Sequence, residues 1–200
     1  MYGVSGTYRM RAAWLVALLC LAPALPAEAQ DTHPLFEARL GANVTGVELW
    51  TGFRPYPDWV QFERLDTVQV ELLFNPPEIA DVLSYLGSPR IAFGGHLSTA
   101  GRASMIYSGL NWQWAITGPV FVEATVGGAL TNSTLENATP PDRNVGCPAL
   151  LYFSAGVGAE IADGWNVIAQ VYHASHAALC GLNAPNRGLN GYGVKVGHSF

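Results

Sequence analysis

The sequence is poor in charged residues, and after its first thirty residues it has no long apolar run. Asp, Glu, Lys and Arg make up 12% of the 200 residues, against about 25% in soluble domains. The net charge of −5 argues against nucleic-acid binding, which depends on basic surfaces. A transmembrane helix needs about 20 consecutive apolar residues, and no such stretch follows the N-terminal segment. An ordinary soluble domain, a nucleic-acid-binding protein and a helical membrane protein are therefore disfavoured.

The hydrophobic residues, 50% of the chain, are spread over short segments together with 22 glycines. Within each segment apolar residues alternate with small or polar ones, which is the pattern of β-strands with one apolar face. This pattern favours an all-β protein, and a membrane barrel over a soluble sandwich. We expect eight strands, at roughly 37–49, 64–74, 90–98, 103–115, 119–130, 149–161, 165–175 and 191–200.

The N-terminus has the features of an export signal. Two arginines precede the apolar run 12–22, and small residues up to Ala29 follow it. This order is that of a secretory signal peptide with its cleavage site. We expect residues 1–29 to be the signal peptide and residues 30–200 to form one exported domain. A start at Met10 gives a more conventional signal than the first Met, and a retained anchor is disfavoured because the apolar run is short.

The connections between the expected strands differ in length at the two ends of the sheet. Short turns are expected at 117–119 and 162–164, and longer loops at 50–63, 131–148 and 176–190. Short turns at one end and long loops at the other are typical of outer-membrane barrels, in which the long loops are external.

Two connections do not follow this rule on length, whereas the C-terminal residue supports an outer-membrane barrel. The connection 98–103 is short although it falls at the end with the long loops, and the connection 75–89 is long although it falls at the end with the short turns. Within the latter, residues 79–86 are expected to form a helical turn at the inner membrane interface. The last strand ends on Phe200, and a C-terminal aromatic residue resembles the assembly signal of outer-membrane barrels. We therefore expect an eight-stranded antiparallel transmembrane β-barrel in the cell outer membrane.

A barrel of eight strands has an interior that side chains fill. Alternation directs Arg39, Glu71, Glu123, Glu160 and Lys195 into this interior. Buried charges must be paired, so we expect these five residues to form an internal polar network with a structural rather than a catalytic role.

Two cysteines, Cys147 and Cys180, remain after the signal peptide with Cys20 is removed. In an oxidising compartment two cysteines favour a disulfide, and the spacing of a metal site is absent. Both cysteines fall at the loop end of the barrel, so a bridge would tie the loop after 165–175 to the barrel wall. Two free buried thiols are the alternative.

The strand 165–175 carries a histidine and a serine on its apolar face. His173 and Ser175 continue the face of Trp165, whereas Asn166 and Gln170 point the other way. Serine becomes a nucleophile when an adjacent base takes its proton, and two residues on one strand face lie side by side. By itself a His-x-Ser sequence is common by chance, and it would then indicate only polar residues at the rim of the barrel. Facing lipid at headgroup depth, it can reach an ester in a membrane lipid.

Several segments resemble one protein family, the lipid A 3-O-deacylases, also called the PagL or acyloxyacyl hydrolase family. The C-terminal signature of this family has His-x-Ser-Asn, then Asn-x-Gly followed by a hydrophobic residue, then a last strand ending in Phe. The matching segments of this chain are Val171–Cys180, Asn186–Gly193, Leu86–Arg90, Tyr107–Trp112 and Phe121–Ala129.

The resemblance implies a serine esterase on the outer surface of an eight-stranded outer-membrane barrel. His173 would be the general base and Ser175 the nucleophile, without metal or cofactor. The enzyme would remove the 3-O-linked acyl chain from lipid A, so its partner would be lipopolysaccharide in the outer leaflet. The strand ending in Phe200 would be read by the outer-membrane assembly machinery, and no nucleic acid would bind.

The chain departs from the family pattern at two positions. His176 stands where the family has the asparagine on the oxyanion and substrate side, and Asn190 stands where it has the acid that orients the histidine. Alternation directs His176 to the lumen unless the strand ends first. Asparagine can hold an imidazole but cannot stabilise the imidazolium as a carboxylate does. A weak esterase and a non-catalytic barrel with a degenerate site therefore both remain open, and a soluble lipocalin-like carrier is disfavoured by the polar lumen.

Overall fold

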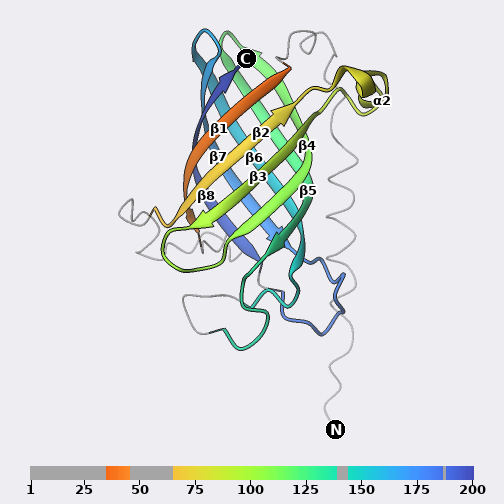
Figure 1. The fold of residues 1–200 in the computed structure, drawn as a ribbon, viewed down its shortest axis with the longest axis vertical. Helices are drawn as coiled ribbons and strands as arrows, with labels where there is room; N and C mark the ends of the chain where they lie inside the picture. The colour runs from red at the N-terminus through yellow and green to blue at the C-terminus, as the bar shows by residue number, and fades with distance from the viewer. Residues whose placement is uncertain (1–34, 46–64, 139–143, 187) are drawn as a thin grey trace.

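The described residues form a closed antiparallel β-barrel. The computed structural model describes residues 35–45, 65–138, 144–186 and 188–200, so the expected signal peptide and parts of the first two expected strands (46–49 and 64) lie outside them. Each strand pairs with its neighbour in sequence, and the last strand closes the barrel on the first (Figure 1). The eight strands are β1 Phe36–Thr45, β2 Thr67–Phe74, β3 Arg90–Ser98, β4 Met105–Thr117, β5 Val120–Thr131, β6 Ala149–Ala162, β7 Trp165–Ser175 and β8 Leu189–Ser199. The eight expected strands are confirmed.

The outer face of the barrel is apolar and the inner face is polar. On β1, Leu40 is 62% exposed while its neighbour Arg39 is 2% exposed. On β4, Ile106 is exposed and Asn111 is buried. Large apolar side chains exposed over a whole closed sheet indicate a surface made for lipid rather than for water.

The lumen contains the expected ionic network, with one exception. The Nη1 atom of Arg39 lies 3.0 Å from Glu71 and 2.8 Å from Glu123. The Nζ atom of Lys195 lies 2.8 Å from each of the same two glutamates. The prediction for Glu160 is wrong: it is exposed, because β6 continues past the network to the rim of the barrel.

Two charged residues that the sequence analysis did not assign extend this network. Glu37 accepts hydrogen bonds from Arg39 and Arg90, and Asn166 also donates to it. Each buried charge thus has a partner of opposite sign, which is the condition for keeping charges out of water.

Aromatic side chains fill the lumen next to this network. The rings of Tyr107 and Tyr152 stack at 4.1 Å between centroids, and those of His96 and Tyr172 lie 4.3 Å apart. The Tyr107 hydroxyl donates to Glu71 at 2.8 Å, which joins the aromatic and ionic layers. The interior is packed with side chains, as expected for a barrel of this size.

The two ends of the barrel differ as expected from the connection lengths. The turns after β4 and β6 lie at the same end as the C-terminus, and the loops after β5 and β7 lie at the opposite end (Figure 1). The expected helical turn is confirmed as η3 Pro77–Ile79 and α2 Ala80–Ser84, at the short-turn end. No helix in the described part of the chain is long and apolar enough to cross a membrane. The loop end of the barrel is the end that carries the loops after β5 and β7.

Candidate active site

His173 and Ser175 lie together on the outer face of β7, at its loop end. They are half-buried, while Ala174 between them points into the lumen and is fully buried. The Nε2 atom of His173 lies 2.9 Å from Oγ of Ser175. The alternation of the strand therefore suffices to put a base within hydrogen-bonding distance of a hydroxyl.

Asn190 completes the arrangement from the neighbouring strand. It is the direct partner of His173 in the β7–β8 register, and its Oδ1 lies 2.5 Å from Nδ1 of His173. An amide oxygen only accepts hydrogen bonds, so Nδ1 carries the proton. Nε2 then has the lone pair that accepts the proton of the Ser175 hydroxyl, and this is the tautomer that a general base needs.

Gly188 lies against the imidazole on the loop side, a role that the sequence analysis did not assign. Its φ angle is +64°, and a Cβ at this position would lie 2.9 Å from Cε1 of His173 and 3.0 Å from the carbonyl oxygen of Ala174. Only glycine fits such a contact in this backbone conformation. The Asn-x-Gly stretch pointed to this glycine, but its role depends on a packing contact with His173 that the sequence does not show.

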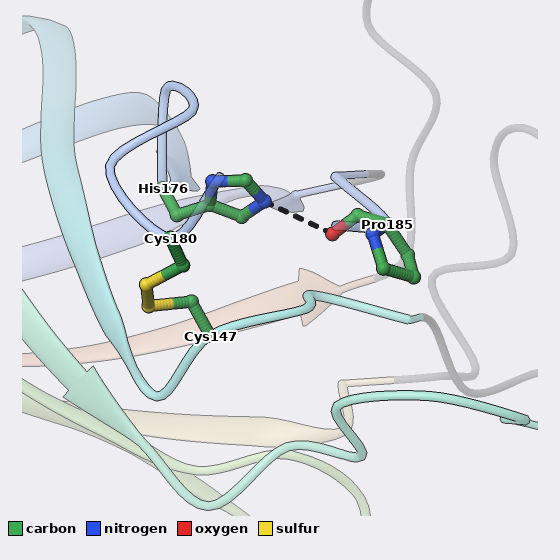
Figure 2. The surroundings of a disulfide bond; sticks show 4 residues. All are labelled: Cys147, His176, Cys180 and Pro185. Atoms are coloured by element: carbon green, nitrogen blue, oxygen red, sulfur yellow. Dashed lines mark hydrogen bonds between the residues drawn. A yellow bond between two sulfur atoms is a disulfide. The ribbon is translucent and has the colours of Figure 1, made fainter. Parts of the chain in front are cut away.

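His176 lies outside the strand, because β7 ends at Ser175. Its side chain is 1% exposed, and its Nε2 lies 3.0 Å from the carbonyl oxygen of Pro185 (Figure 2). The imidazole is thus engaged by the loop between β7 and β8. A contact with substrate or with an oxyanion, the role expected for this position, stays a prediction.

The expected disulfide is confirmed. Cys147, just before β6, is bonded to Cys180 in the loop after β7, with their Cα atoms 6.0 Å apart (Figure 2). Next to it, Gly146 has a φ of +69°, and a Cβ there would lie 2.1 Å from the carbonyl oxygen of Pro185. The two loops are therefore joined by a covalent bond and by close backbone packing at the end where His173 and Ser175 lie.

A family model described as "Lipid A 3-O-deacylase (PagL)" matches residues 84–199. The chain belongs to the PagL family. The match covers more than half of the chain and includes His173, Ser175 and Asn190.

Comparison with solved structures concerns the fold alone. The match to the crystal structure of the outer membrane enzyme PagL spans 82% of this chain and 99% of the PagL chain, with 16% identity and a TM-score of 0.54. The match to the crystal structure of Neisserial surface protein A (NspA) spans 82% of this chain and 96% of the NspA chain, with 8% identity and a TM-score of 0.46. A search among curated proteins found no match. This PagL family member is an eight-stranded antiparallel β-barrel of the outer membrane, as expected from the sequence.

Proposed function

We propose that this chain is an outer-membrane serine esterase that removes the 3-O-linked acyl chain from lipid A. The observation that carries the proposal is the series of contacts from Asn190 Oδ1 to His173 Nδ1, at 2.5 Å, and from His173 Nε2 to Ser175 Oγ, at 2.9 Å. A nucleophile, a base and a group that orients the base, all within hydrogen-bonding distance, form the pattern of covalent acyl-transfer catalysis.

The reaction follows from these contacts in two steps. Ser175 attacks the ester carbonyl while its proton moves to Nε2 of His173, and the imidazolium then protonates the sugar oxygen that leaves. Water attacks the acyl-serine in the second step, with His173 again as the base, and releases a free fatty acid. Asn190 keeps the ring in its orientation throughout, but it adds no charge to stabilise the imidazolium.

We assign the oxyanion side to the backbone of the turn that follows Ser175. Ala177 and Ala178 both have positive φ angles, 45° and 68°, a conformation that is rare for residues with a Cβ and clusters at functional sites. Within the described residues, their backbone N–H groups make no hydrogen bond. Successive free N–H groups beside a nucleophile can stabilise a developing negative charge, and the imidazole of His176 is bound to Pro185 instead.

The position of these residues supports lipid A as the substrate. His173 and Ser175 face outward near the loop end of an apolar outer surface, and long loops of such barrels are external. A lipid ester at the level of the headgroups can therefore reach Ser175 without leaving the membrane.

The test is the acyl pattern of lipid A in cells that express the protein. Mass spectrometry should show loss of one ester-linked hydroxyacyl chain with the wild type, and no loss with Ser175→Ala. Ser108→Ala, which removes an outward-facing hydroxyl on β4, is the matched control and should behave as the wild type. An unchanged acyl pattern with assembled wild-type protein would favour the alternative, a non-catalytic barrel with a degenerate site.

Phe200 supports a second part of the proposal, recognition by the outer-membrane assembly machinery. Its backbone N–H donates to Phe36 O at 2.9 Å, and the residue as a whole is 70% exposed. The residue thus directly follows β8 and is accessible. Deletion of Phe200 should reduce the amount of heat-modifiable, assembled barrel, and Phe200→Tyr should not. Equal assembly of both variants would contradict this part.

A further inference from the structure

The loop 176–188 determines how the two halves of the site meet. Ser175 directly precedes it, and Asn190 lies two residues beyond it. The β7–β8 ladder ends with the pair Ala174 and Leu189, one step past His173 and Asn190. Beyond this pair, strand pairing no longer restrains the backbone, so other contacts must hold the loop against the imidazole.

The disulfide holds only the first part of this loop. Cys180 is bonded to Cys147, but seven residues lie between Cys180 and Gly188. A segment of that length can adopt many conformations unless further contacts restrain it.

Pro185 is restrained from two sides. Its carbonyl oxygen accepts a hydrogen bond from Nε2 of the buried His176 at 3.0 Å (Figure 2). Gly146 approaches the same oxygen so closely that a Cβ would lie 2.1 Å from it. Because a carbonyl oxygen only accepts, Nε2 of His176 must carry the proton.

Pro185 precedes Gly188 by three residues, and Gly188 in turn touches the edge of the His173 ring. The chain that leads into Gly188 therefore starts from a carbonyl group that is restrained on two sides. We propose that His176 is a positioning residue of the esterase: by donating to Pro185 it holds Gly188 against His173, so that the ring stays between Asn190 and Ser175. This inference rests on the proposed function.

This role gives a physical meaning to the histidine that stands at a position where the family pattern has asparagine. The asparagine side chain is too short to place a donor as far from the backbone as Nε2 of an imidazole. Glutamine places an N–H donor at about the distance of Nε2 from the backbone, and leucine has a similar volume without a donor. These two residues therefore separate the hydrogen bond from the filling of space.

The experiment compares His176→Gln with His176→Leu in the full-length protein in lipid A micelles. His176→Leu should lower kcat about tenfold to a hundredfold, because a displacement of about 1 Å at a catalytic group can cost a factor of that size. KM should change less than about twofold, since no substrate contact is removed. His176→Gln should keep kcat within about threefold of the wild type. A wild-type kcat in assembled His176→Leu would overturn the proposal.

A second variant perturbs the same carbonyl from the other side. Gly146→Ala should lower kcat in the same way, because its Cβ would displace the Pro185 oxygen. Gly101 has a similar positive φ, +72°, with open space around it. Gly101→Ala therefore controls for the backbone strain that alanine causes at such an angle. If His176→Leu does not assemble, the comparison of Gly146→Ala with Gly101→Ala decides, and equal kcat values would overturn the proposal.

An NMR measurement separates failure of this inference from failure of the proposed function. The Cε1–H signal of His173 reports the contact with Gly188 whether or not the protein hydrolyses lipid A. It should shift in His176→Leu and keep its position in His176→Gln. If wild-type protein leaves lipid A intact, the proposed esterase fails, and an unshifted signal in His176→Leu would then also overturn the positioning role.

Discussion

Asn190→Asp is the substitution that tests the chemistry of the site most directly. The Oδ1 atom of Asn190 lies 2.5 Å from Nδ1 of His173. Aspartate has nearly the same shape, so the contact and the tautomer are kept and only a negative charge is added. The charge acts when His173 takes the proton of Ser175, because the imidazolium forms at that moment.

The gain can be calculated from this geometry. With about 4 Å between the charge centres and an effective dielectric constant of about 20, the attraction is about 4 kcal/mol. His173 is half-buried, so water weakens the attraction, and about 2 kcal/mol, typical of a charged hydrogen bond, is the lower limit. Since about 1.4 kcal/mol corresponds to a tenfold change in rate, kcat/KM should rise about 30-fold to 1000-fold. The reverse change in a serine protease costs about 10⁴-fold, because there the asparagine also stabilises the wrong tautomer.

The assay is the initial rate of fatty acid release from lipid A micelles by assembled protein. Asn190→Asp should be faster than the wild type, and Asn190→Ala slower, because alanine no longer orients the ring. The double variant Asn190→Asp with Ser175→Ala should be inactive, which shows that the gain uses the same nucleophile. An assembled Asn190→Asp variant that is no faster than the wild type would refute the reasoning that the missing charge limits the site.

Three further predictions concern the packing around the site and the interior of the barrel. Gly188→Ala should lower the rate at least about tenfold, because the new Cβ would lie 2.9 Å from the imidazole of the site, whereas Gly181→Ala, with φ +105° and open space, should not. Lys195→Met should destabilise the barrel by about 3–5 kcal/mol in urea unfolding, because two buried glutamates each lose one of their ion pairs; a change below about 1 kcal/mol would contradict the paired network. Cys147 and Cys180 should resist alkylation until a reductant is added, and labelling of either without reductant would contradict the bridge.

The contacts of individual residues show how far the sequence could predict the site. His173 and Ser175 share a face because consecutive strand residues alternate, so their proximity followed from local geometry. Asn190 was indicated by the family resemblance, but its 2.5 Å contact depends on the register of two strands. His176 could not be placed, because its direction changes with the residue at which β7 ends.

For the two cysteines the sequence favoured a bridge over free thiols. By itself it determined the eight strands, the apolar outer face and the loop end. These properties depend on side-chain alternation and on connection length, which are local. Only the tertiary structure decided that Glu160 lies at the rim while Glu37 and Arg90 join the internal network. It also decided that Gly188 lies on the imidazole and that His176 holds Pro185. The physical reason is that these contacts join residues through strand register and loop packing, and neither leaves a periodic signal in the chain.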